Sequence, residues 1–152
     1  MMRAEDQFHV GIVAVDFEAT LATLSAVLGS EWGPEVGGPV AVRLPGREAV
    51  LELKCRYSTT VPRLEVVRSV AGTLWEPVRD AGIHHIGYWS DDVVADVVEL
   101  ESHGYLIEAT RAADAGRLFF AFLRAANGFR VELVDRSAES GLSRCWAHSD
   151  IR

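Results

Sequence analysis

Two histidines and two glutamates occupy matching places in an internal repeat, and together they could bind a divalent metal ion. His9 opens the segment HVGIVAVD, and His85 opens the matching segment HIGYWSDD. Glu65 and Glu132 are each the centre of a short apolar run, in RLEVV and RVELV. Imidazole and carboxylate groups suit Zn, Ni, Co, Mn or Fe(II), so the sequence predicts one metal site shared between two halves.

The repeat extends beyond these four residues. Residues 9–24 align with residues 85–100, and Asp16 then matches Asp92. In each copy a largely apolar run ends at the aspartate, whose carboxylate can cap the start of a helix. Apolar residues then recur at helical spacing, and a glycine follows that can end the helix. The two halves therefore carry the same local signals in the same order.

These signals predict the element order β-α-β-β-β twice. In the first copy we expect strands at 7–15, 40–44, 49–57 and 63–68, a helix at 17–28 and a glycine-rich loop at 30–38. In the second copy we expect strands at 84–89, 105–109, 118–123 and 129–134, with a helix at 93–103. Asn127-Gly128 predicts a type I′ hairpin turn, because both residues tolerate a positive φ.

The repeat also predicts the organisation of the chain. We expect a single domain over residues 1–152, in which module one (7–68), a linker (69–83), module two (84–135) and a tail (136–152) follow one another. The tail has no clear periodicity and is expected to be loop or a short helix.

Composition narrows the class of protein. Hydrophobic residues make up 49% of the chain and charged residues 24%, which is typical of a globular domain. The formal net charge of -7 argues against nucleic acid as a partner, because such a surface needs clustered basic residues. No apolar run approaches the roughly 20 residues of a membrane span. Cys55 and Cys145 form no disulfide framework, so a cytoplasmic protein is expected.

Strand geometry places the four candidate ligands. Side chains alternate between the two faces of a strand, so His9 shares a face with Gly11, and His85 with Gly87. Two modules related by a pseudo-twofold axis would bring equivalent faces together, with His9 opposite His85 and the two glutamates opposite each other. A cation bound there would stabilise negative charge on a substrate oxygen and ease removal of a proton from the adjacent carbon.

These segments resemble the vicinal oxygen chelate superfamily, which includes glyoxalase I, methylmalonyl-CoA epimerase, extradiol dioxygenases, and bleomycin and fosfomycin resistance proteins. The resemblance rests on the two histidine-led segments, including Gly-Ile-His-His-Ile-Gly at 82–87, and on the two Glu-centred strands, and it covers residues 7–135. It implies an α+β fold in which two tandem βαβββ modules form a curled mixed sheet around a metal-binding cup. By position, it implies the metal ligands His9, Glu65, His85 and Glu132.

The resemblance also implies an activity. A His/Glu/His/Glu set is more similar to the glyoxalase and epimerase branches than to the dioxygenases, and Glu132 or Glu65 would act as the catalytic base. This implies an isomerase, epimerase or glyoxalase-type lyase that transfers a proton next to a metal-bound oxygen of a small organic metabolite. Methylmalonyl-CoA epimerases carry a further glutamate on the second strand of the first module, where this chain has Val40-Ala41-Val42.

Two other functional classes remain open. In an Fe(II) dioxygenase, Glu65 would not bind, and His9, His85 and Glu132 would form a facial triad. A non-catalytic protein that binds a small molecule such as a drug would not need the metal. The resemblance also allows a homodimer, because members of the superfamily often pair modules across chains.

Other residues have competing interpretations. Glu52 is the alternative fourth ligand, but Glu65 is preferred because its strand matches that of Glu132. His84 is expected to face away from His85 and to be structural. His103 at a helix end and His148 in the tail are expected to have no site role, and Cys55 is expected to be an apolar filler. Core packing is preferred for the aromatic residues that could instead wall a pocket: Trp32, Trp75, Trp89, Phe119, Phe120 and Phe122.

Overall fold

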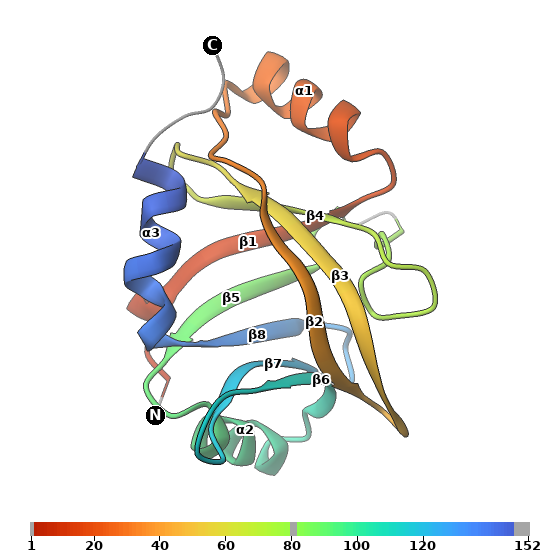
Figure 1. Cartoon of the computed structure of the whole chain (residues 1–152), viewed down its shortest axis with the longest axis vertical. Helices are drawn as coiled ribbons and strands as arrows, with labels where there is room; N and C mark the ends of the chain where they lie inside the picture. Colours follow the sequence, from red (N-terminus) through yellow and green to blue (C-terminus); the bar gives the residue numbers. More distant parts are fainter. Residues whose placement is uncertain (1, 80–81, 148–152) are drawn as a thin grey trace.

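Within residues 2–79 and 82–147, which this computed structural model describes, eight strands form a closed barrel (Figure 1). The first half provides β1 (Gln7–Ala14), β2 (Val36–Leu44), β3 (Arg47–Tyr57) and β4 (Leu64–Arg68). The second half provides β5 (His85–Ser90), β6 (Leu106–Ala112), β7 (Leu118–Arg124) and β8 (Arg130–Asp135). Around the barrel the order is β1-β4-β3-β2-β6-β7-β8-β5.

The two halves are joined along two seams. β1 pairs antiparallel with β5 on one side, and β2 pairs antiparallel with β6 on the other. Within each half, the first strand pairs parallel with the last, β1 with β4 and β5 with β8. This arrangement is a curled mixed sheet built from two tandem β-α-β-β-β units, so the predicted α+β fold class is confirmed.

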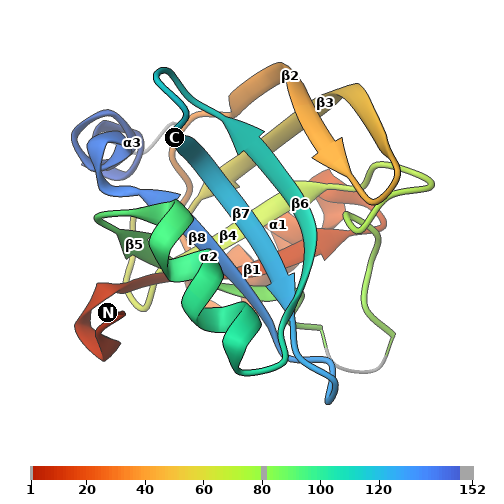
Figure 2. The same ribbon diagram turned by 90° about the horizontal axis from the view of Figure 1, so that it is seen from below.

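Two equivalent helices cover the outside of the barrel, α1 (Phe17–Leu28) and α2 (Val93–Ser102). Asp16 caps α1 by accepting a hydrogen bond from the backbone N–H of the third helical residue at 3.0 Å, and Asp92 caps α2 in the same way at 3.1 Å. The apolar stripe of α1 packs against β4 and the buried Trp32, and α2 lies across β7 and β8 (Figure 2). The predicted helices and caps are confirmed.

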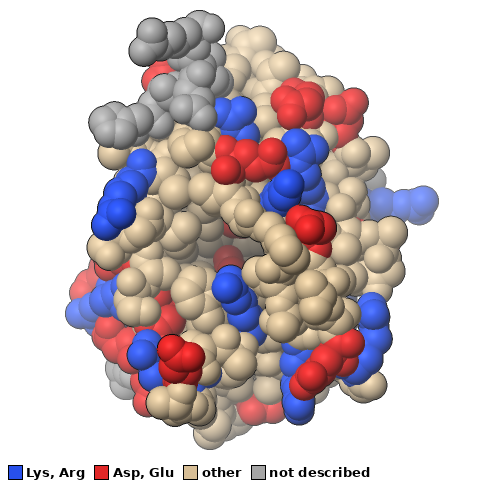
Figure 3. Space-filling model, viewed as in Figure 1, with Lys and Arg blue, Asp and Glu red and all other residues tan. Residues whose placement is uncertain are grey.

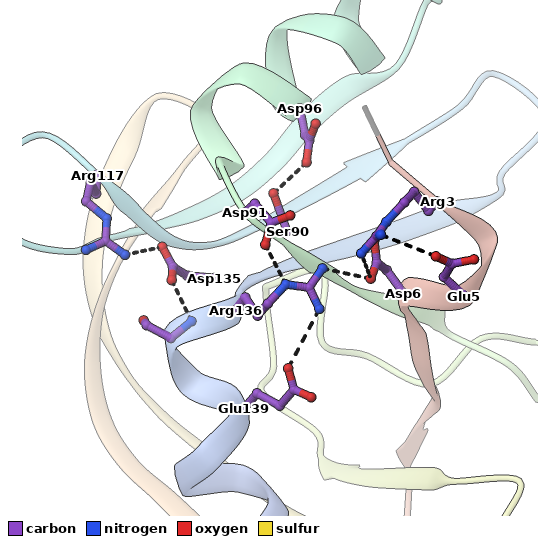
Figure 4. A network of polar contacts seen from close by, with 11 residues as sticks. Arg3, Glu5, Asp6, Ser90, Asp91, Asp96, Arg117, Asp135, Arg136 and Glu139 are labelled. Atoms are coloured by element: carbon purple, nitrogen blue, oxygen red, sulfur yellow. Dashed lines mark hydrogen bonds and ion pairs between the residues drawn. The ribbon is translucent and has the colours of Figure 1, made fainter.

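A third helix, α3 (Glu139–Ala147), follows a single 3-10 turn (Arg136–Ala138) and flanks the barrel. Arg136 fixes its start, because its guanidinium contacts Asp6 at 2.7 Å and Asp91 at 2.5 Å, and also reaches Glu139 in the first turn of α3 (Figure 4). Its other end lies close against the backbone of Gly33, where an added Cβ would lie 1.7 Å from the carbonyl oxygen of Cys145. In its described part, residues 136–147, the tail therefore forms a short helix that packs against the barrel.

Three local predictions are wrong. β2 begins at Val36, inside the predicted loop at 30–38, because its glycines pair with β3 in spite of their poor strand preference. β6 continues to Ala112 rather than stopping at 109, since pairing with β7 extends it. The turn at Asn127-Gly128 is not type I′: only Gly128 has a positive φ, and its N–H donates to the carbonyl of Ala125, as in a type I turn followed by a left-handed glycine.

Most of the core lies inside the barrel and beneath the helices. One buried cluster lies in the interior and includes Val13, Val42 and Phe122, and two smaller clusters lie under α1 and α2. In the described part of the chain, no helix is long and apolar enough to cross a bilayer.

Candidate metal centre

The four predicted ligands lie on the strands that begin and end each half. Glu65 of β4 is opposite Gly11 of β1, and Glu132 of β8 is opposite Gly87 of β5. Across the seam between the halves, β1 and β5 pair His9 with Gly87, and Gly11 with His85. The pairing is therefore the same in both halves, as a pseudo-twofold axis through this seam requires.

The four side chains meet at one point. The Nε2 atoms of His9 and His85 are 3.0 Å apart. Each of these nitrogens lies 3.0–3.4 Å from the Oε1 atoms of Glu65 and Glu132. One donor atom from each residue lies within 4.8 Å of all the others. Donor atoms at about 2.0–2.2 Å from one cation are roughly 3.0–3.5 Å from one another. The distances between the imidazole nitrogens and the carboxylate oxygens therefore fit a single coordination shell.

Two glycines create the space for this meeting. A Cβ added at Gly11 would lie 2.0 Å from Cε1 of His85, and one added at Gly87 would lie 2.0 Å from Cε1 of His9. Each imidazole therefore rests directly on the backbone of the neighbouring strand. This packing explains why a glycine lies two residues after the histidine in both halves.

The cluster is almost completely shielded from solvent. His9 is 2% exposed and His85 1%, while Glu65 and Glu132 are 6% and 8% exposed. Two carboxylates at such depth are costly unless they are neutralised. The Oε1 atom of Glu132 forms no hydrogen bond of acceptable geometry among the described residues, although both imidazole Nε2 atoms lie within 3.4 Å of it. A divalent cation would satisfy this oxygen and balance both charges, so the residues present fit such an ion.

Burial and charge act against each other on the ionisation of the cluster. Burial lowers the pKa of His9, but Glu65 and Glu132 outweigh this effect and raise the pKa to about 9. Burial raises the pKa of Glu65, but the two imidazoles hold it well below its usual value. Without a cation, the cluster therefore keeps a proton on imidazole at neutral pH, and an entering cation must displace it.

We therefore expect the affinity for Zn²⁺ to increase with pH. Because the pKa of His9 is raised from 6.5 to about 9, the affinity should rise about tenfold per pH unit below pH 9 and level off above it. The same shift stabilises the metal-free fold below pH 6.5, and that stabilisation is lost as pH rises through 9. Titration calorimetry in two buffers of different ionisation enthalpy should show at least about one proton released per ion at pH 7, because the pKa of His85 is raised as well. Binding without proton release would contradict this prediction.

His84 was predicted to face away from the site, and this is wrong. It precedes the first residue of β5, so strand alternation does not apply, and its Nδ1 lies 2.9 Å from Nδ1 of His85. Its Nε2 lies 2.6 Å from the carbonyl oxygen of Leu74, which can only accept a hydrogen bond. His84 therefore donates from Nε2 and accepts at Nδ1, so His85 carries a proton on Nδ1 and its Nε2 is the nitrogen that faces the cluster and could bind a cation.

This relay fixes the tautomer that a metal ligand needs. Burial lowers the pKa of His84 to about 3, so His84 stays neutral and able to accept. The sequence carried one signal for this role, the direct adjacency of two histidines in Gly-Ile-His-His-Ile-Gly. That signal did not reveal the carbonyl of Leu74, which lies in the linker.

Replacing His84 with phenylalanine should weaken Zn²⁺ binding about 10- to 100-fold, the usual cost of losing an outer-shell partner of a histidine ligand. His84→Gln serves as the matched variant, because its amide can accept from His85 and donate to Leu74 and should recover most of the affinity. Competition with a chromogenic chelator measures both constants. Equal affinity in His84→Phe and the unaltered protein would show that the relay has no influence on the site.

A cavity of about 250 Å³ opens onto the cluster. In Figure 3 it appears as a hollow in the surface, with acidic atoms at its floor and a basic side chain at its rim. Glu65 and Glu132 line its floor. Apolar side chains form most of its wall: Val36, Val40, Leu53, Val67, Trp75, Phe119, Phe120, Phe122, Val134 and Leu142. The volume is slightly below that of drug-sized pockets, so the cavity suits a small organic molecule.

The structure separates the residues with competing interpretations. Glu52 is exposed on β3 and lies opposite Pro39, whereas Glu65 joins the cluster. Trp75 and the three phenylalanines line the cavity, while Trp32 packs in the core beneath α1 and Trp89 stacks on Phe8. His103 ends α2. His148 lies outside the described residues.

Two residues beside Glu65 were not singled out as site residues. Tyr57 lies opposite Glu65 in the β3–β4 pairing, and Cys55 lies two residues before it on the same face. Both line the cavity, and burial together with the charge of Glu65 raises the pKa of each well above its usual value. They therefore present a neutral phenol and a neutral thiol to the carboxylate. Strand alternation from Glu65 across the hairpin was the signal that could have found them.

Comparison with known proteins agrees with this geometry. The profile of a family described as "Glyoxalase/Bleomycin resistance protein/Dioxygenase superfamily" matches residues 8–122. No curated protein matches the sequence.

Solved structures share the fold at low sequence identity. Methylmalonyl-CoA epimerase from Mycobacterium tuberculosis has a TM-score of 0.53 and 17% identity, with 89% of this chain and 92% of that chain covered. A Streptomyces coelicolor methylmalonyl-CoA epimerase in complex with 2-nitronate-propionyl-CoA has a TM-score of 0.51 and 20% identity, with 86% and 96% covered. A hypothetical protein from Bacillus halodurans C-125 has a TM-score of 0.51 and 18% identity, with 85% and 92% covered.

Proposed function

The chain belongs to the glyoxalase/bleomycin resistance protein/dioxygenase superfamily, and we propose that it is a metal-dependent enzyme that transfers a proton at a carbon next to a substrate oxygen. The observation that carries this proposal is the buried cluster of His9, Glu65, His85 and Glu132 at the floor of an apolar cavity. The products would be those of an isomerase, an epimerase or a glyoxalase-type lyase.

The four residues would hold one divalent ion, which when bound would supply Lewis acidity toward the substrate oxygen. The carboxylates of Glu65 and Glu132 both line the cavity and approach the imidazoles from opposite halves of the barrel. The pKa of each is held below its usual value, so both are ionised at neutral pH and able to accept a proton. Either glutamate is therefore placed to take a proton from the substrate carbon and return it.

The apolar wall and the burial of the site would keep water away from the transferred proton. His9 and His85 are held against backbone by Gly87 and Gly11, so they orient the site without large movements. Four protein donors also distinguish this site from a dioxygenase facial triad, which uses three and leaves more positions open.

The second strand distinguishes this site from that of the methylmalonyl-CoA epimerases. The resemblance places a further glutamate there in those enzymes, whereas Val40 of β2 lines the cavity here and Val42 is 2% exposed. Proton transfer in this protein would therefore depend on Glu65 and Glu132, which are the two carboxylates that line the cavity.

Deuterium exchange tests the proposal directly. The purified protein is analysed for bound metal, loaded with Zn²⁺, Ni²⁺ or Co²⁺, and incubated with methylmalonyl-CoA in D₂O. Methylmalonyl-CoA is the first substrate because two structural neighbours are epimerases of that compound. Deuterium at the α-carbon, lost on chelation and in Glu132→Gln, is expected, and a panel of 2-hydroxy and 2-oxo compounds extends the search.

Other outcomes would assign the protein to other classes. Oxygen consumption by iron-loaded protein would favour the hypothesis of an Fe(II) dioxygenase. Ligand binding that is unaffected by chelators and by His9→Ala would favour a binding protein. Absence of bound metal under all loading conditions would overturn the proposal itself.

A further inference from the structure

One arginine lines the same cavity as the two glutamates of the candidate metal centre. Along β6, Ala109 is fully buried, and Arg111 lies two residues further on the same face of the strand. Arg111 lines the cavity, and its guanidinium lies 4.6 Å from the ring centroid of Phe119. It is the basic residue that strand alternation directs to the interior of this wall.

A local irregularity creates this contact. β6 and β7 pair Arg111 with Phe120 and then Ala112 with Leu118, so Phe119 is an extra residue at a β-bulge. Bulges redirect side chains, and here the extra ring lies beneath the guanidinium and holds it at the cavity wall. The position of Arg111 is therefore set by the backbone as well as by its own side chain.

Arg111 has no acidic partner among the described residues, unlike three arginines on or next to other strands of the barrel. Arg68 pairs with Glu35, Arg117 with Asp135, and Arg130 with Glu108. Arg111 forms no ion pair with a carboxylate anywhere in residues 2–79 and 82–147. A half-buried guanidinium beside an apolar wall is a strong binding site for a carboxylate or phosphate, because its planar fork can donate two hydrogen bonds at once.

The rest of the cavity indicates what such a ligand must look like. The two carboxylates at the floor would be balanced by a divalent ion, so Arg111 leaves the cavity with a net positive charge. Lys54 borders the mouth, but it lies between the inward-facing Leu53 and Cys55 and its charge acts on Glu35, so it belongs to the outer face of β3. All other wall groups are neutral and mostly apolar.

We propose that the substrate is a small organic anion with an apolar body, whose anionic group binds Arg111 while an oxygen at its other end faces the four-donor cluster. Only one part of this inference rests on the proposed function, namely that the oxygen at the far end of the substrate faces the four-donor cluster. The contact with Arg111 stands on the cavity, the bulge and the unpaired guanidinium.

The test compares an anion with its uncharged counterpart. Calorimetry measures binding of 3-phenylpropionate and 3-phenylpropionamide to Zn²⁺-loaded and to chelator-treated protein. In Arg111→Met, which keeps an unbranched side chain but removes the guanidinium over Phe119, the carboxylate should bind about 10- to 100-fold more weakly while the amide is unchanged. Arg111→Lys should recover part of the loss. Lys54→Gln, the matched removal of a positive charge at the mouth, should change binding by less than about twofold.

Three results would overturn the inference. One is equal binding of carboxylate and amide by the unaltered protein. Another is an equal loss in Arg111→Met and Lys54→Gln, which would indicate a general charge effect. The third is carboxylate binding that disappears on chelation but persists in Arg111→Met, which would place the anion at the cation instead. Metal content is measured in every variant, so a failure to bind metal would count against the proposed function and leave the Arg111 contact to be judged on the chelator-treated protein.

Discussion

Replacing His85 with glutamine is expected to remove the bound divalent ion, lowering its affinity by at least about 100-fold, and to abolish metal-dependent activity. The Nε2 atom of His85 lies 3.0 Å from Nε2 of His9, 3.0 Å from Oε1 of Glu65 and 3.4 Å from Oε1 of Glu132. Its loss would leave three donors and two buried carboxylates with less compensating charge. Glutamine keeps most of the volume, so cavity formation does not dominate the result.

Thermal unfolding gives a second measure of the same change. An ion at about 1,000 times its dissociation constant stabilises the fold by about 4 kcal/mol, or roughly 8–16 °C in a chain of this size. The unaltered protein should show this increase on addition of Zn²⁺, and His85→Gln should not. His103→Gln, at the exposed end of α2, is the control and should behave like the unaltered protein. A full equivalent of tightly bound metal in His85→Gln would exclude the proposed centre.

Adding a single methyl group at Gly11 or Gly87 is expected to damage the site almost as severely. The new Cβ would lie 2.0 Å from the imidazole of His85 or His9, respectively, so the ring must move out of the cluster or the two strands must separate. Overpacking of this kind costs about 1–3 kcal/mol, which corresponds to a decrease in Tm of roughly 2–12 °C. Metal affinity should fall together with stability, because the displaced ring is a ligand.

The matched control is Gly38→Ala. Gly38 also lies in a strand, but a Cβ there meets nothing within 4 Å, and its φ is not positive. This variant should retain full metal binding and be at least as stable as the unaltered protein. The pseudo-symmetry adds a further check, since Gly11→Ala and Gly87→Ala should have similar effects. Retention of normal metal affinity in both would mean that the imidazoles are not held as the structure shows.

Much of this arrangement could be predicted from the sequence because the repeat fixes position and strand alternation fixes direction. His9 and His85 lie at the same place in two copies, so one register determines both, and the same holds for Glu65 and Glu132. Asp16 and Asp92 marked the helix starts for a local reason, since a cap needs only the N–H groups that follow it. These signals are short in range or duplicated, and they were sufficient for the element order, while the resemblance to the superfamily supplied the fold class.

The features that could not be predicted depend on partners far away in the sequence. His84 is oriented by a carbonyl in the linker, at Leu74. β2 begins early because β3 pairs with its glycines, and β6 extends because β7 continues beside it. The inward direction of Arg111 is set by the face of β6 that closes the barrel, and the bulge that supports it has no local sequence signal. The homodimer, the cytoplasmic location and the module boundaries stay predictions.

The division of donors between the two halves has a consequence for fragments of the chain. A polypeptide that ends before β5 would contain only two of the four donors, one imidazole and one carboxylate. Its β1 would present an unpaired edge where β5 now lies. Two such fragments, associated through that edge, would rebuild a complete shell with true twofold symmetry. Ion capture would then depend on protein concentration, whereas in the fused chain the second half is always within reach.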